Sequence, residues 1–145
     1  MEQLSSKSLY QLINKSLKSF AATKKFKKNK STFTSWYFQY NKKFISFWFQ
    51  ASRYGGEFTC EFQISDNPLP GSAKWNQRLR IYPLLNSQGL HELKKISGPL
   101  SGKEDIWIKA NEKDTSYFLI FFVNNFDEML KRFINHKALA AINIT

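Results

Sequence analysis

The chain has 145 residues, 42% of them hydrophobic, which is enough for one domain that buries a core of its own. One cysteine, Cys60, excludes an intramolecular disulfide framework and favours a reducing, cytoplasmic location. The net charge is +11, and the longest apolar run has seven residues against the roughly twenty of a membrane helix, so we expect a soluble protein.

Most of the positive charge lies near the N-terminus. Residues 1–30 hold eight lysines and one acid, giving +7, whereas the other 115 residues hold 14 bases and 10 acids, giving +4. Five of these lysines lie in the stretch KKFKKNK at 24–30, namely Lys24, Lys25, Lys27, Lys28 and Lys30. Such a cluster can bind an acidic protein or a phosphate backbone, or can remain solvated.

The first predicted element is a helix from Ser6 to about Ala22. Apolar residues recur there every three or four positions, which places them on one face of a helix. They are Leu9, Leu12, Ile13, Leu17 and Phe20. Ser5 or Ser6 can cap the first turn. The segment does not have the basic start and following apolar run of a signal peptide, so we expect none. The lysine stretch then connects this helix to the next element.

From Ser31 the pattern changes to period two, with β-branched and aromatic residues that favour strands. STFTSWYFQY and FISFWFQAS flank a polar turn at 41–43, and EFTCEFQIS at 57–65 follows the turn SRYGG. These segments predict a three-stranded antiparallel meander over residues 31–65. In the third strand we expect one buried face, Phe58, Cys60, Phe62 and Ile64, and one solvated polar face, Glu57, Thr59, Glu61 and Gln63.

The second half of the chain is less regular. DNPLPGS breaks the pattern, QRLRIYPLL predicts a fourth strand, and 86–104 is a predicted loop with one helical turn around LHELKKI. DIWIKA and TSYFLIFFV form a second hairpin, unless the latter is a buried helix. Asn125 and Glu128 predict the cap of a helix over 126–135 that points Met129, Leu130 and Phe133 inward. We therefore expect one α+β domain over residues 1–145, an antiparallel sheet of four to six strands with N- and C-terminal helices packed on one face.

Few residues favour catalysis. His91 and His136 lie in different segments and there is no second cysteine, so we expect no metal site. Cys60 alternates with core residues, which favours an inert thiol. Gly55 and Gly56 precede a strand, not a helix that could hold phosphate, so we also expect no cofactor. The sharpest enzymatic pattern is a nuclease-like set at Glu57, Glu61 and Gln63, but it needs an acid from a neighbouring strand and residues 31–51 contain none.

Three short motifs occur in a familiar order. They are the basic pair Lys27 and Lys28, the strand pair Phe49 and Gln50, and the RLR stretch from Arg78 to Arg80. In this order the chain resembles the bacterial family of domain of unknown function 4304, whose members carry a GFKKKG-like segment, an NFQ-like strand and an RLR stretch. The resemblance implies an α+β domain without an established activity. Some similar proteins look like neighbours of bacterial toxin and immunity genes.

Together these observations predict a non-catalytic protein-binding domain of a bacterial cytoplasm, with an immunity-like role in a toxin system as its concrete form. The expected partner is an acidic protein. The residues expected to bind it are Lys24, Lys25, Lys27, Lys28, Lys30, Arg78 and Arg80. One alternative is a small basic nucleic-acid-binding protein, in which Trp36, Tyr40, Trp48 and Tyr54 stack on bases. A further alternative is a divergent metal-dependent nuclease.

Overall fold

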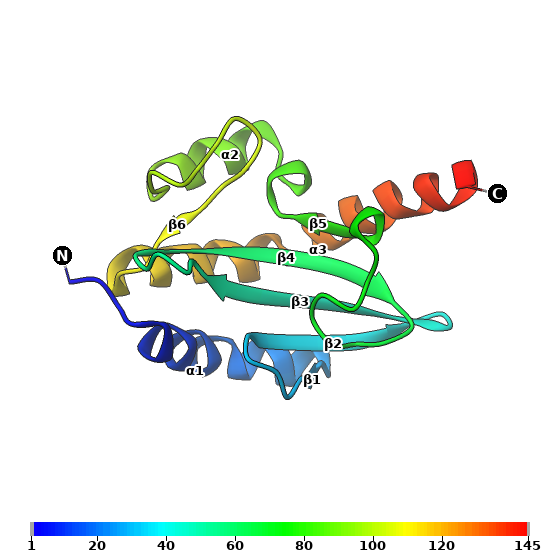
Figure 1. The fold of residues 1–145 in the computed structure, drawn as a ribbon, viewed down its shortest axis with the longest axis horizontal. Helices are drawn as coiled ribbons and strands as arrows, with labels where there is room; N and C mark the ends of the chain where they lie inside the picture. The colour runs from blue at the N-terminus through cyan, green and yellow to red at the C-terminus, as the bar shows by residue number, and fades with distance from the viewer. Residues whose placement is uncertain (1, 145) are drawn as a thin grey trace.

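An antiparallel sheet of six strands organises the computed structural model, which describes residues 2–144, with side chains up to Lys137 (Figure 1). The helices are α1 (Ser6–Lys24), α2 (Ser87–Lys94) and α3 (Glu112–Ile144). The strands are β1 (Lys27–Lys28), β2 (Thr34–Tyr40), β3 (Lys43–Ala51), β4 (Glu57–Ser65), β5 (Arg78–Arg80) and β6 (Ile108–Lys109). Two short 3-10 helices, η1 (Trp75–Gln77) and η2 (Tyr82–Leu84), flank β5. The predicted α+β class is confirmed.

The strands follow the order β1-β2-β3-β4-β5, and β6 pairs with β4 beside β5. Glu57 and Phe58 at the start of β4 pair with β6, whereas residues 61–63 pair with β5. The predicted meander over β2, β3 and β4 is confirmed. Its first turn joins Tyr40 to Lys43 through two residues, and Asn41 takes a left-handed backbone with φ 55°, which Asn tolerates better than most residues.

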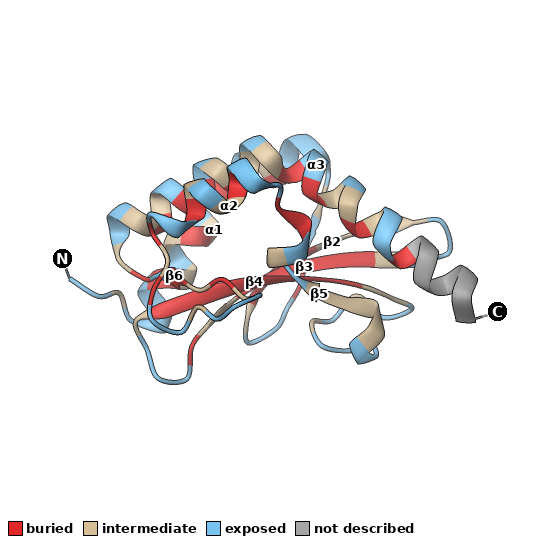
Figure 2. Cartoon of the chain, turned by 90° about the horizontal axis from the view of Figure 1, so that it is seen from above, coloured by how far each residue is buried: buried red, intermediate tan, exposed pale blue. Residues whose placement is uncertain are grey.

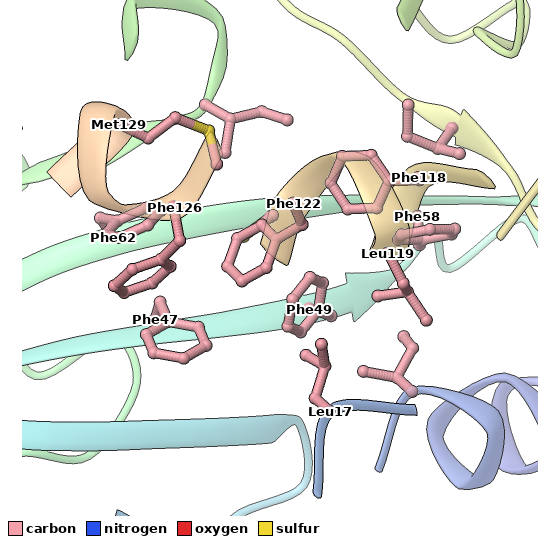
Figure 3. Close-up of a cluster of buried hydrophobic side chains, with 14 of the residues drawn as sticks. Leu17, Phe47, Phe49, Phe58, Phe62, Phe118, Leu119, Phe122, Phe126 and Met129 are labelled. Atoms are coloured by element: carbon pink, nitrogen blue, oxygen red, sulfur yellow. The ribbon is translucent and has the colours of Figure 1, made fainter. Parts of the chain in front are cut away.

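The core lies between the sheet and the helices, which Figure 2 shows on one side of the sheet. Phenylalanine rings from β3, β4 and α3 meet there (Figure 3). The ring centroid of Phe122 on α3 lies 5.1 Å from that of Phe49 and 5.5 Å from that of Phe47. From α1, Leu9, Ile13 and Leu17 are buried, as the helical spacing predicted. On β4, Phe58, Cys60 and Phe62 are buried as predicted, and Ile64 is half-buried.

The segment 115–123 is helical, so the alternative of a second hairpin is wrong. It belongs to α3, which continues for 33 residues. The helix does not begin at Asn125 as the capping pattern predicted. Asn111 Oδ1 accepts a hydrogen bond from the backbone N–H of Asp114 at 2.8 Å, whereas Asn125 lies inside the helix and donates to the carbonyl of Phe121. Phe118, Phe122 and Phe126 recur every four residues, which is the helical period that spans the expected boundary.

The second face of the sheet, opposite the helices, is covered by irregular chain (Figure 2). The prediction that β4 presents a solvated polar face is therefore wrong, because Glu57, Thr59, Glu61 and Gln63 are all buried. Thr59 donates to the carbonyl of Ile106, and Gln63 bonds to the segment 67–73. Alternation within one strand could not reveal this cover, since the covering segments have no period of their own.

Two elements differ in extent from their predictions. The fourth strand is three residues long and ends in η2, where Pro83 cannot donate to a strand ladder. The helical turn expected around LHELKKI is the eight-residue α2, which Asn86 caps by accepting from the N–H of Gly89 at 2.7 Å. None of the helices described for residues 2–144 combines the length and the apolarity needed to cross a membrane.

Candidate functional site

The lysine stretch forms the edge of the sheet, and we name Lys24, Lys25, Lys27, Lys28 and Lys30 the lysine edge. Lys25 ends α1 in a left-handed conformation with φ 62°, and the chain then turns into β1. There Lys27 pairs with Tyr37 and Lys28 with Trp36 of β2. The sequence predicted a loop here, because two residues are too few to show an alternating pattern.

Phe26 anchors this edge to the core. Its ring stacks on Phe38 at 4.9 Å between centroids and lies 5.5 Å from Phe47 and 5.3 Å from Phe126. The backbone N–H of Phe26 also donates to the carbonyl of Ala21 in the last turn of α1. An apolar residue in the middle of five lysines therefore fixes their backbone against the sheet.

The five lysines differ in their surroundings. Lys24 forms an ion pair with Asp127 of α3 at 2.6 Å. The ammonium of Lys28 lies 4.9 Å from the ring centroid of Trp36, and partial burial lowers its pKa. Lys25, Lys27 and Lys30 are exposed and form no ion pair within the described part of the chain. All five lysines are exposed, and three of them have neither an ion pair nor an aromatic ring as partner in the described part of the chain.

Arg78 and Arg80 lie on β5, at the opposite end of the strand order from the lysine edge. Arg78 Nε bonds to Glu61 Oε1 at 2.8 Å, and its guanidinium lies 5.7 Å from the centroid of Trp48. Arg80 Nη1 bonds to Asp105 Oδ2 at 2.7 Å, and its guanidinium lies 5.2 Å from the centroid of Trp107. The structure therefore separates the two predicted basic groups, and both arginines have an acid partner of their own.

The nuclease-like set, Glu57, Glu61 and Gln63, lies on the second face of the sheet, and each of its side chains already binds another group of the protein. Glu57 Oε1 accepts from the backbone N–H of Leu100 at 3.0 Å, and Glu61 pairs with Arg78. Gln63 binds backbone groups of the following segment. Among the residues that the structure describes, no three His, Cys, Asp or Glu side chains lie together as metal ligands would.

The remaining sequence candidates lie apart from one another. Cys60 is fully buried in the core, and burial, followed by the neighbouring Glu61, raises the pKa of its thiol well above the usual value. Such a thiol stays protonated and reacts slowly. His91 on α2 and His136 on α3 are both exposed.

The aromatic residues expected to stack on bases are mostly buried. Trp36 and Trp48 lie in the sheet, and Tyr40 is half-buried. Tyr54 is 73% exposed, with Arg53 4.9 Å from its ring, and Trp75, which no sequence pattern predicted as a site, is 86% exposed. The position of Trp75 just after the turn-rich segment DNPLPGS was the available signal for its exposure.

No family model, curated protein or solved structure matches this chain. The resemblance to domain of unknown function 4304 therefore stays a prediction. Several of the residues that carry this resemblance have a structural role in the fold. Phe49 is fully buried in the core, and Arg78 and Arg80 pair with Glu61 and Asp105. Of the residues that carry the resemblance, only Lys27 and Lys28 belong to the lysine edge.

Proposed function

We propose that this protein is a non-catalytic domain that binds an acidic partner protein through the lysine edge, with an immunity-like role in a bacterial toxin system as its concrete form. The observation that carries the proposal is the presence of three exposed cations, Lys25, Lys27 and Lys30, on and beside an edge strand that Phe26 anchors to the core. A rigid cationic edge attracts an acidic surface and speeds the encounter with it.

An edge strand also offers unpaired backbone groups to a binding protein. Within the described sheet β1 pairs with β2 on one side and with no strand on the other. Lysines on such an edge oppose pairing with another copy of the same basic strand, while an acidic strand can approach. The charge therefore selects the partner and the backbone can hold it.

A protein partner is favoured over a nucleic acid by the aromatic residues. Binding of single strands combines a basic groove with exposed rings on which bases stack. Trp36 and Trp48, the tryptophans of β2 and β3, are instead buried. The exposed Tyr54 lies in the turn between β3 and β4, whereas the rings of β2 that pair with the lysine edge are the buried Trp36 and the half-buried Tyr37.

The proposal that the domain is non-catalytic is supported by the polar side chains of β4, which already bind other groups of the protein. A general acid or a metal ligand needs a carboxylate that can reach a substrate. Glu57 and Glu61 are buried, and each already binds a protein group, the N–H of Leu100 and the guanidinium of Arg78.

The test compares two triple variants of equal charge. Lys25→Glu, Lys27→Glu and Lys30→Glu change the lysine edge, and Lys7→Glu, Lys15→Glu and Lys18→Glu change exposed positions of α1. Each set lowers the net charge of +11 by six, to +5. Fluorescence anisotropy with a labelled poly-glutamate peptide, and in parallel with random duplex DNA, is measured at physiological salt.

We expect the edge variant to lose at least about tenfold in affinity for the acidic peptide, whereas the α1 variant loses clearly less. Equal losses in both variants would show that net charge alone matters and would contradict the proposal. Tighter binding of DNA than of the peptide, with a steep salt dependence that only the edge variant removes, would favour the nucleic-acid alternative instead.

A further inference from the structure

A cavity of about 610 Å³ lies between α3, the β2–β3 turn and the segment that leads into β5. Figure 1 shows α3 passing beside this segment before its C-terminal end. Residues from all three parts line it, including Tyr40, Lys43, Lys74, Phe133, Ile134 and Lys137. The cavity is separate from the lysine edge, none of whose five lysines lines it.

Lys137 is an unusual lining residue, because it is a lysine with only 6% of its surface exposed. Its Nζ donates one hydrogen bond, to the carbonyl of Asn76 at 2.6 Å, although an ammonium carries three donors. Among residues 2–137 no carboxylate pairs with it. Removing an ammonium from water without an opposite charge is costly, and accordingly burial lowers the pKa of Lys137.

The rest of the lining adds positive charge and an apolar wall. Lys74 is exposed and pairs with no acid in the described part, while Lys43 bonds to Asp66 at 2.8 Å. Together with Lys137, three lysines and one aspartate give the lining a charge of +2. Ile64 of β4 and Ile134 of α3, both half-buried, form the apolar part, whereas Phe133 is fully buried. The cavity therefore complements a molecule that has one acidic end and one apolar end.

We propose that this cavity binds a small organic anion, whose carboxylate or phosphate group contacts Lys137 and whose apolar part lies against Ile64 and Ile134. The anion replaces the missing opposite charge of the buried ammonium. The acidic group accepts hydrogen bonds from the N–H groups of Lys137 that do not bond to the carbonyl of Asn76. The apolar part displaces water from these two half-buried side chains.

The experiment titrates the full chain by calorimetry with sodium hexanoate, sodium acetate and inorganic phosphate, at constant ionic strength in chloride buffer. The test variant is Lys137→Met, which keeps an unbranched side chain of similar length and removes its charge. The matched control is Lys131→Met, an exposed position of the same helix. Lys74→Met at the rim is a second variant that leaves the buried position intact.

We expect hexanoate to bind the wild type and the Lys131→Met protein equally, and Lys137→Met at least about tenfold more weakly, because a charged hydrogen bond is lost. Hexanoate should also bind at least about tenfold more tightly than acetate, since it has about four more methylenes and each one that is fully buried strengthens binding roughly fourfold. Lys74→Met should weaken binding by a smaller factor. Phosphate should bind more weakly than hexanoate, and its binding should also be weakened by Lys137→Met.

Three results would overturn the proposal: no hexanoate binding at tens of millimolar, unchanged binding by Lys137→Met, or equal affinities for acetate and hexanoate. A second measurement does not depend on any variant. In protein with ¹³C-dimethylated lysines, the pKa of Lys137 measured by NMR should rise when hexanoate is added, because an anion stabilises the charged form. A pKa that does not change would place the anion elsewhere.

Discussion

Gln63 of β4 shows how single residues hold the second face of the sheet. Its side chain is fully buried, and both ends of the amide are used. Nε2 donates to the carbonyl of Leu69 at 2.9 Å, and Oε1 accepts from the backbone N–H of Gly71 at 3.0 Å. A buried amide that meets backbone groups in this way replaces a strand partner for the segment 67–73.

Gln63→Leu should therefore lower the free energy of unfolding by about 2–4 kcal/mol, since at least two backbone groups would lose their hydrogen-bond partners. Gln39→Leu, on the exposed part of β2, is the matched control and should change it by less than about 0.5 kcal/mol. Urea unfolding followed by tryptophan fluorescence measures both. A loss below about 1 kcal/mol for Gln63→Leu would mean that the segment is held by other contacts.

Cys60 permits a chemical test of the core. Because burial raises the pKa of its thiol and removes it from solvent, the native protein should react with a disulfide reagent far more slowly than the protein unfolded in guanidinium. The rate is followed by the absorbance of the released thiolate. Native and unfolded protein reacting at similar rates would contradict the burial of this residue.

Lys137 also makes stability depend on pH. Its pKa lies below the ordinary value of 10.5 in the folded state, so between the two values the unfolded chain binds more protons than the native protein. The free energy of unfolding therefore rises with pH through that window. Thermal melts at pH values up to 10.5 should show this rise in the wild type relative to Lys137→Met. A difference between them that does not vary with pH would contradict it.

At the scale of elements, the agreement between sequence and structure follows the strength of the repeating pattern. α1 and the strands β2, β3 and β4 have a clear period, and their positions are predicted within a few residues. α3 was divided in two because the run at 117–123 is apolar on every side and Asn125 with Glu128 has the spacing of a cap by coincidence. The two-residue β1 has no period at all, so the nature of the lysine edge could not be foreseen.

The start of α3 can be tested by replacing its competing cap residues. Asn111→Ala should cost about 0.5–2 kcal/mol, because the N–H of Asp114 loses its acceptor. Asn125→Ala should cost less, since alanine is a better helix former and the amide of Asn125 only bonds within the helix. Denaturant unfolding of the two variants gives the comparison. The reverse order would mean that the helix begins where the sequence pattern suggested.

At the scale of the whole molecule, the two faces of the sheet are built by different principles. The helix face is a cluster of phenylalanine rings from α1, β3, β4 and α3, of which alternation and helical spacing identified Phe20, Phe58, Phe62 and Phe133. The second face is held by polar side chains bonded to irregular chain, and its cover depends on contacts between distant segments. The predicted binding residues also depend on contacts between distant segments. Arg78 and Arg80 were expected to act with the lysine edge, but the strand order places them at the opposite end of the sheet, and this order cannot be read from the pattern of any one segment.

Phe122 joins the parts of the core, with its ring within 6.5 Å of rings from α1, β3, β4 and α3. Phe122→Ala should reduce the free energy of unfolding by about 3–5 kcal/mol. Fluorescence and circular dichroism should still report one shared transition, because the ring belongs to every layer. Tyr54→Ala, at an exposed turn, is the control and should change stability little. Two separate transitions in the wild type would show that the layers unfold independently.

The segment between β4 and β5 has a consequence for how this protein can vary. It is held mainly through its own backbone: the carbonyl of Pro68 accepts from Asn29 at 2.9 Å and from Ser46 at 2.6 Å, and Gln63 binds the groups beyond it. These three side chains come from beside β1, from β3 and from β4. Every residue except proline offers the same backbone N–H and carbonyl, so many substitutions within the segment, though not at Gly71 with its φ of 80°, leave the contacts in place. A single-residue insertion or deletion would shift every later donor and acceptor, so its length is constrained more strongly than its composition.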